Sequence, residues 1–417
     1  MPKIVCNIQI SRSGLVAVCC VLLAPWLLLI GREIVSRPSV PKLLPKTISS
    51  KYPPTTRVFK CKPGPWGDLE CTKIRIEPPD EFISTSDYAP NPLRWVLKNF
   101  SKKQLDELLE SAHLDASQRK TLLAKAKKDP SINGWVIAPD EGLVWKLKPD
   151  QRSIIYSTLS VFPENPSQYE PFRFRAETAD EWFEESDLLP ETISLVKNLL
   201  YQRGTSLLFS DFDLVLPLLA SNAEKKKLLK TLSRKSTLLI KLMVNKDSDL
   251  PALVRYWGKG GRSKDLEPLL RSLSNVPGGQ EIDLNHLLTA FARMRMYTYP
   301  VPSDDPTASR HDCYWTCMNF FSRHVDDRFA DVKYVKQILE SDYYPIPSNP
   351  LFGDLMFLTK PNGEAVHAAV YIADDILFTK NGASYSSPWI LMSLKDIIAF
   401  YPSNLPLQVR VYRSKMF

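Results

Sequence analysis

The sequence lacks the short motifs that identify several large classes of enzyme. Its 417 residues contain no Walker phosphate-binding loop, no glycine-rich dinucleotide fingerprint and no His-Glu-x-x-His zinc motif. No segment repeats at a fixed period, although stacked helix pairs remain an option. The net charge of +8 is not gathered into the basic patch of a nucleic-acid binder. We therefore expect no nucleic-acid partner and no metal or organic cofactor.

Charge is also missing from residues 14–31, a mainly apolar run of 18 residues. Lys3 and Arg12 precede the run, no Ala-x-Ala cleavage site follows it, and no lipobox surrounds Cys19 or Cys20. A run of roughly 18 to 20 apolar residues is enough to cross a bilayer as a helix. We therefore interpret residues 1–31 as an uncleaved signal anchor rather than a cleaved signal peptide. We expect a single-pass membrane protein held through residues 14–31.

Two opposing signals bear on the side of the membrane that receives the rest of the chain. Basic residues after the apolar run outnumber those before it, which favours retention in the cytoplasm. A short basic leader ahead of an apolar run is instead the layout of exported proteins. We favour export, which makes the C-terminal domain extracytoplasmic.

Residues 32–92 are rich in proline and in basic side chains. Their 11 prolines are typical of an extended linker rather than of a folded core. The basic side chains suit contact with a membrane surface or a cell-wall polyanion, or simply a solvated linker. Cys61 and Cys71 bound a short loop that a disulfide would close in an oxidising compartment, and the alternative is two unrelated thiols.

Residues 93–290 show a mostly helical pattern and form the second expected domain. A capping serine and amphipathic spacing predict a helix over 101–110, and similar patterns occur at 116–127, 150–159, 190–201, 223–233 and 250–256. Strand candidates interrupt this pattern at 134–138 and 143–147, and the apolar runs 207–209 and 238–244 are ambiguous. The region carries no chemical motif, so docking of a protein partner is the role left open to it.

The residues that carry chemistry lie near the C-terminus. Asp312 is a favourable N-cap and apolar residues follow it at helical spacing, so Cys313 is expected in the first turn of a helix. Free backbone N–H groups and the positive end of the helix dipole stabilise a thiolate there. Cys313 is therefore a candidate nucleophile, and the alternative is a small buried side chain.

A histidine follows on a predicted strand. Apolar and β-branched residues at 355–358, 366–372, 376–379 and 407–412 predict the strands of one antiparallel sheet. His367 lies on the second strand, and we expect the helix from Cys313 to pack on the sheet with its sulfur facing the imidazole. Either Thr379 or Asn381 on the next strand can orient the imidazole through its second ring nitrogen. We prefer Asn381, because threonine is a poor orienting group.

These segments resemble the NlpC-type cell-wall cysteine peptidases of the papain-like superfamily. The resemblance rests on the pair Asp312-Cys313, on Gly353-Asp354-Leu355-Met356-Phe357 and on His367-Ala-Ala-Val-Tyr-Ile372, and it covers about residues 290–417. That family often uses a tyrosine upstream of the cysteine, and Tyr299 is the nearest counterpart. It usually has Ser-Gly after the Asp-Cys pair, where this chain has Tyr314-Trp315.

The resemblance implies an α+β protein: a membrane segment, a helical middle region and a papain-like hydrolase domain over residues 291–417. It implies hydrolysis of an amide bond in peptidoglycan stem peptides or a similar small peptide. Cys313 would attack the carbonyl, and His367 would act first as base and then as acid. The backbone N–H of Cys313, assisted by Tyr299, would stabilise the oxyanion. The alternative is a non-enzymatic, membrane-anchored binding or scaffold protein with a degenerate NlpC-like domain.

Two further interpretations concern the same region. Cys317 lies one helical turn beyond Cys313 and is expected in the core. A zinc site would draw on His311, Cys313, Cys317 and His324, but the Cys-x3-Cys-x6-His spacing matches no strong zinc pattern.

Overall fold

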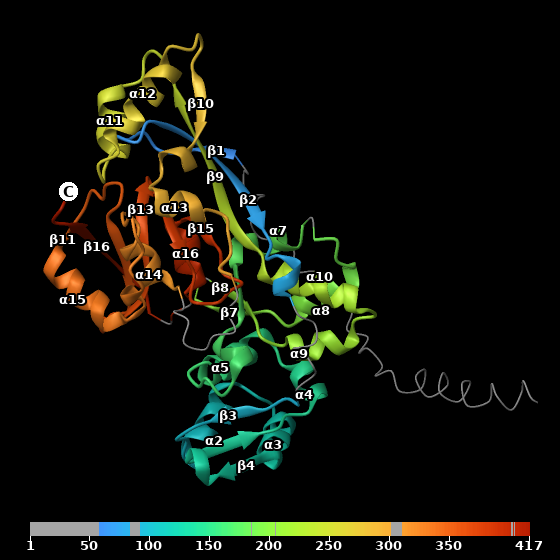
Figure 1. The fold of residues 1–417 in the computed structure, drawn as a ribbon. Helices are drawn as coiled ribbons and strands as arrows, with labels where there is room; N and C mark the ends of the chain where they lie inside the picture. Colours follow the sequence, from blue (N-terminus) through green and yellow to red (C-terminus); the bar gives the residue numbers. More distant parts are fainter. Residues whose placement is uncertain are drawn as a thin grey trace, which may run out of the picture. The chain divides into compact units, whose positions relative to one another are not determined.

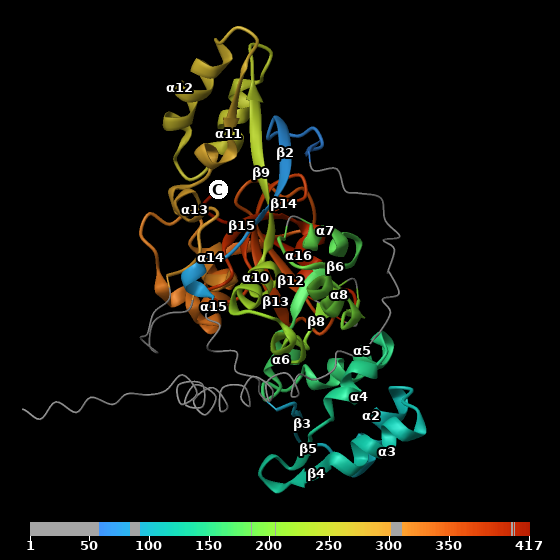
Figure 2. The same cartoon turned by 90° about the vertical axis from the view of Figure 1, so that its right-hand side faces the viewer.

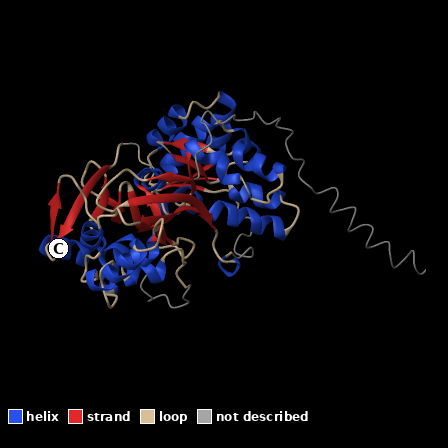
Figure 3. Ribbon diagram, turned by 90° about the horizontal axis from the view of Figure 1, so that it is seen from above, coloured by secondary structure: helices blue, strands red, loops and turns tan. Residues whose placement is uncertain are grey.

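The computed structural model describes residues 58–83, 92–184, 186–204, 206–301, 311–401, 403 and 405–417. The membrane anchor expected at residues 14–31 lies outside the described residues. Within these ranges, no helix combines the length and the apolar character that a bilayer crossing requires. Helices and antiparallel sheets alternate along the chain (Figure 3), so the α+β expectation is confirmed.

The C-terminal region is built on a six-stranded sheet in the order β11-β16-β12-β13-β14-β15. Every neighbouring pair in it is antiparallel, which confirms the prediction of a single antiparallel sheet. The strands are β11 (Tyr343–Ile346), β12 (Leu355–Thr359), β13 (Ala365–Ala373), β14 (Ile376–Lys380), β15 (Trp389–Ser393) and β16 (Gln408–Ser414).

Different helices pack against the two faces of this sheet. Alternate residues such as Phe357, Ala368 and Phe378 join the core that contains α14 (Cys313–Met318) and that α15 (Val332–Asp342) also contacts. The intervening residues, such as Leu358, Ala369 and Leu377, pack against α16 (Leu394–Phe400) on the other face. This division follows from the two-residue period of a strand.

A second sheet corrects the assignment of residues 32–92 as a linker over residues 58–83, which the structure describes. It has the order β1-β2-β9-β10, and β2 and β9 run alongside each other for nine residues (Figure 1). Leu69 and Cys71 of β2 are fully buried. The prolines of this region flank β2 and leave its own backbone donors free to pair. The strands are β1 (Val58–Lys60), β2 (Asp68–Ile76), β9 (Lys235–Val244) and β10 (Gln280–Asp283).

Cys61 and Cys71 lie side by side at the end of this β1–β2 hairpin. Both are free thiols, and their sulfur atoms are 3.2 Å apart. The backbone N–H of Cys61 donates to the carbonyl of Leu69 at 3.0 Å, which fixes the base of the loop between them. The two thiols are therefore neighbours in the fold rather than unrelated side chains.

The middle region mixes helices with two small sheets, so the expectation of a mostly helical domain is only partly met. Ser101 caps α2 with a reciprocal capping box, as predicted. Residues 143–147 were expected as a strand, but they lie mainly in α4, which begins after the N-cap Asp140. A five-residue apolar run is too short to distinguish the 3.6-residue period of a helix from the two-residue period of a strand.

The small sheets have the orders β3-β5-β4 and β6-β8-β7. Their strands are β3 (Trp95–Leu97), β4 (Ala126–Asp129), β5 (Gly134–Ile137), β6 (Phe172–Arg175), β7 (Tyr201–Arg203) and β8 (Ser206–Phe209). The helices of the region are α2 (Lys102–Ser111), α3 (Ala116–Lys125), α4 (Glu141–Lys146), α5 (Pro149–Leu159), α6 (Pro166–Tyr169), α7 (Ala179–Phe183), α8 (Pro190–Asn198), α9 (Phe212–Val215), α10 (Asn222–Ser233), α11 (Leu250–Trp257), α12 (Ser263–Ser274) and α13 (Ala290–Arg295).

The boundary expected at residues 290/291 runs through a hydrophobic core. One cluster of buried side chains includes Trp257 on α11 together with Trp315 and Phe352 of the C-terminal region. Hydrogen bonds also cross the boundary: the hydroxyl of Thr237 donates to the Leu391 carbonyl at 2.9 Å and accepts from its N–H at 3.1 Å. The described residues accordingly belong to one compact unit. Residues 291–417 are therefore not a separate domain.

A fragment of residues 291–417 should not unfold cooperatively by itself. It would expose the face of its sheet that α11 and β9 cover in the whole chain, and it would lose the Trp257–Phe352 ring contact at 5.2 Å. Urea unfolding followed by tryptophan fluorescence tests this, with a fragment of residues 58–417 as the control. A sharp, reversible transition of the short fragment would contradict the shared core.

Candidate functional site

Cys313 is the first residue of α14, as predicted. The Asp312 carboxylate caps this helix by accepting a hydrogen bond from the Trp315 N–H at 2.9 Å. The Cys313 side chain is buried, with 6% of its surface exposed. The backbone N–H of Ala368 lies close enough to the sulfur to favour its thiolate form, which places the sulfur against β13.

His367 lies on β13, one residue before that N–H, and its ring is fully buried. Its Nε2 is hydrogen-bonded to the Thr379 hydroxyl oxygen at 2.7 Å. Its Nδ1 is buried and has no hydrogen-bond partner. The ring stacks on Tyr401 with the two centroids 4.5 Å apart. Thr379 therefore holds the imidazole and leaves one nitrogen available.

The imidazole lies on the α16 face of the sheet, because His367 pairs with Leu358 of that face. Helix α14 packs on the opposite face, and Cys313 stands at its tip. No hydrogen bond joins the Cys313 sulfur to the imidazole among the described residues. The expectation that the Cys313 sulfur faces the imidazole is therefore not met, because α14 and the imidazole lie on opposite faces of the sheet.

The expected third residue, Asn381, does not hydrogen-bond His367. Its side-chain amide donates to the sulfur of Met392 at 3.1 Å, and its Oδ1 is buried without a partner. The preference for Asn381 over Thr379 is therefore wrong for the hydrogen bond that orients the ring. Thr379 and Asn381 share parity, but Thr379 lies within β14 on the α16 face beside His367, whereas Asn381 follows the last residue of that strand.

Tyr299 was expected beside the thiol, but its ring packs edge-on against Phe82 with centroids 6.3 Å apart. Its hydroxyl is buried without a hydrogen-bond partner, and the nearest charge that raises its pKa, after burial, is that of Glu77. Among the described residues, no hydrogen bond or ring contact joins Tyr299 to Cys313 or His367. Its expected role at the oxyanion has no contact to support it.

Tyr314 and Trp315, the bulky residues after Cys313, hold α14 in place. The Tyr314 hydroxyl donates to the carbonyl of Ala365 at the start of β13, at 3.1 Å. Trp315 is fully buried, donates from its ring to Asp327 at 2.9 Å and stacks on His311. These contacts give the two residues a structural role beside the thiol.

Burial sets the protonation states of the thiol and the imidazole. It raises the pKa of Cys313 to about 12, and the neighbouring Asp312 carboxylate adds to the rise. It also lowers the pKa of His367 to about 3. At neutral pH the site thus holds a neutral thiol and a neutral imidazole rather than a thiolate–imidazolium pair.

Lys380 was missed by the sequence analysis. It follows Thr379 on β14, is fully buried, and its ammonium donates to the carbonyls of Gly382 and Ser384 at 2.7 and 3.0 Å. Burial lowers its pKa to about 8, against the opposing effects of the Asp312 and Cys313 charges. A buried cation thus lies near the thiol, and only the fold brings it there.

The zinc interpretation has no structural support. Among the described residues, no group of three or more His, Cys, Asp or Glu side chains is arranged to hold a metal ion. Cys317 lies in the hydrophobic core.

Comparison with known proteins does not extend this description, because no family model, curated protein or solved structure matches the chain.

Replacing His367 with glutamine should flatten the loss of stability in acid. His367 stays neutral in the fold but takes up a proton in the unfolded chain near its usual pKa of about 6.5. Its contribution is therefore fully present above that pH and is lost as the pH falls toward 3, by about 1.4 kcal/mol per pH unit. Urea unfolding at pH 7 and pH 4.5 should give a smaller difference for His367→Gln than for the unmodified chain. Equal differences would refute this assignment; the exposed His324, as His324→Gln, is the control.

Replacing Lys380 with methionine should slow alkylation of Cys313 by up to about tenfold below about pH 8, where the Lys380 ammonium is charged, because a nearby cation favours the thiolate. Lys380→Arg keeps the charge and should stay closer to the original rate. The measurement is the iodoacetamide rate between pH 7 and 10, read at Cys313 by mass spectrometry. Identical pH profiles for Lys380→Met and the unmodified chain would remove Lys380 from the site.

Proposed function

We propose that the C-terminal region is a thiol hydrolase that cleaves an amide bond in a small peptide, with the stem peptides of peptidoglycan as its substrate class. One observation carries the proposal. The Cys313 sulfur lies against the backbone N–H of Ala368 on β13, and the residue before Ala368 is His367, which Thr379 holds by Nε2 while Nδ1 stays unpartnered. The peptidoglycan assignment rests only on the resemblance to NlpC-type peptidases.

The tautomer of His367 suits a general base. If Nε2 carries the proton and donates to Thr379, Nδ1 presents a lone pair. The opposite tautomer would leave a buried Nδ1–H without an acceptor, which costs more free energy than an unused lone pair. The favoured state is thus the one that can take a proton from a thiol.

The reaction would proceed through a covalent acyl-enzyme. The Cys313 proton moves to Nδ1 of His367 as the sulfur–carbon bond forms, and the backbone N–H of Cys313 supports the oxyanion. The carbon–nitrogen bond then breaks, and the leaving amine takes the proton from His367. In the second half, water attacks the thioester carbonyl and gives a proton to His367. The carbon–sulfur bond then breaks, the carboxylic acid leaves, and His367 returns the proton to the sulfur. The mechanism requires a rearrangement that brings the Cys313 sulfur and Nδ1 together, because the two groups are not hydrogen-bonded and α14 packs on the face opposite the imidazole.

A second candidate is favoured by a specific observation. The thiol is buried with a pKa of about 12, and no hydrogen bond joins it to the imidazole. These are properties of an inert core cysteine. The chain would then be a membrane-anchored binding or scaffold protein, with the middle region as the surface that docks a partner.

Cys313→Ala should abolish amide hydrolysis by the full chain, with a loss of about 10³-fold or more, while the fold survives. The assay is release of free amine from a synthetic stem peptide, monitored with circular dichroism of the same sample. Cys317→Ala, one helical turn away in the core, is the matched control and should retain activity.

Undiminished turnover by Cys313→Ala would exclude the thiol mechanism. No turnover by the unmodified chain, together with an alkylation rate at Cys313 no faster than that of an ordinary buried thiol, would favour the scaffold function.

A further inference from the structure

A small cavity lies between β6, β9 and α16, away from the Cys313 thiol. Its volume is about 40 Å³, and β6 and α16 lie side by side along it (Figure 2). Basic side chains dominate its lining: Lys73, Arg173, Arg175 and Lys235 face a single acidic residue, Asp396. The middle and C-terminal regions both contribute to it.

The one acidic residue is already neutralised. Arg175 donates from Nη1 to Asp396 and from Nε to Glu177, both at 2.8 Å. Asp396 lies in the first turn of α16, and its carboxylate also accepts from the hydroxyl of the N-cap Ser393 at 2.9 Å. Among the described residues, Arg175 is the cation that forms a salt bridge with this carboxylate.

Besides Lys73, the lining cations without a salt bridge among the described residues are Arg173 and Lys235, although the charge of Glu170 raises the pKa of Arg173 against the effect of burial. Neither forms a salt bridge or a side-chain hydrogen bond among the described residues, and Nε of Arg173 is buried without an acceptor. Both cations lie over the ring of Phe400, at 5.0 and 5.5 Å from its centroid. Aromatic contact offsets only part of the cost of desolvating a cation.

The pKa values of these two cations are also consistent with a missing counter-charge. Burial lowers the pKa of Lys235 to about 8, and the charge of Arg173 adds to the effect. Burial also lowers the pKa of Arg173. Both residues are half-buried, so their like charges repel each other with partial screening, and an anion between them would relieve that repulsion.

We propose that this cavity is a binding site for a small oxyanion, held between the Arg173 guanidinium and the Lys235 ammonium. A water needs roughly 10 to 15 Å³ of such space, so the cavity admits about three waters or one phosphate, sulfate or carboxylate group. The free Nε–H of Arg173 and the ammonium of Lys235 supply charged donors, and Ser236 at the cavity wall adds a hydroxyl. The site is independent of the proposed hydrolase activity.

Thermal unfolding of the full chain at pH 7 tests this site. Sodium phosphate, sulfate and acetate are each titrated against sodium chloride at equal ionic strength. An oxyanion should raise Tm in a saturable way that chloride does not reproduce. Preference for phosphate and sulfate would identify a tetrahedral ligand, and preference for acetate a carboxylate. Equal effects of all four salts would overturn the proposal.

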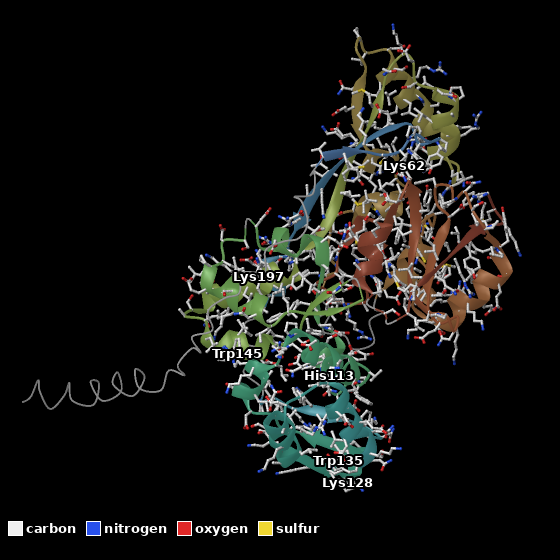
Figure 4. All side chains as sticks on the ribbon, turned by 180° about the vertical axis from the view of Figure 1, so that it is seen from behind. Lys62, His113, Lys128, Trp135, Trp145 and Lys197 are labelled. Carbon is white, nitrogen blue, oxygen red and sulfur yellow. The ribbon has the colours of Figure 1, made fainter. Side chains whose placement is uncertain are left out.

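The variant Arg173→Met with Lys235→Met should lose the oxyanion response. Without oxyanion its Tm should be unchanged or higher than that of the unmodified chain, because two unpaired cations have been removed. Lys235→Gln alone should weaken the response and serves if the double variant does not fold. Lys128→Met is the control: Lys128 is an exposed cation that lies opposite Trp135 on the small sheet (Figure 4) and should keep the full response. A response that persists in both cavity variants would overturn the site.

Discussion

The packing of α14 against β13 is the contact on which the candidate site depends. Trp315 anchors the helix in the core and Tyr314 ties it to the first residue of β13. These two contacts place the sulfur of Cys313 against Ala368. Tyr314 and Trp315 are thus two large side chains that fix the helix.

Desolvation is the dominant influence on each titratable group of the site. It raises the pKa of the Cys313 thiol and lowers those of the His367 imidazole and the Lys380 ammonium. Each group is therefore pushed toward its neutral form, and the attraction between thiolate and cation opposes this only in part. A substrate that brought polar groups into the site would change this balance more than any single side chain does. The reactivity of the thiol at such a site depends on the access of solvent and substrate to the sulfur as much as on the neighbouring residues.

Local patterns were enough to predict the frame of the site. The Asp312 cap, the strands β12 to β14 and their antiparallel order follow from short-range signals in the sequence. Strand parity also carried the information that Thr379 shares a face with His367, although side-chain chemistry led us to prefer Asn381. That error came from giving more weight to the amide group of Asn381 as a hydrogen-bond partner than to the position of Thr379 on β14.

Contacts between distant segments were not predictable in this way. Tyr401 and Lys380 reach the site through the fold, and neither carries a motif. The linker assignment failed at β2 because the strand that pairs with it lies far along the chain. The expected domain boundary failed for the same reason, since burial of Trp257 against Phe352 leaves no trace in either local sequence.

The pairing of β2 with β9 has a consequence for biosynthesis. Ile76 pairs with Lys235, 159 positions later, so β2 emerges from the ribosome long before its partner exists. During that interval the backbone donors of β2 remain exposed. Side chains that the complete fold buries, such as Leu69, are exposed as well. Pairing two strands that lie so far apart in the sequence is slow. Until it happens, the unpaired strand can associate with other chains and aggregate. A nascent chain of this protein is thus vulnerable over its first half, and its burden on chaperones should fall sharply once β9 has been synthesised.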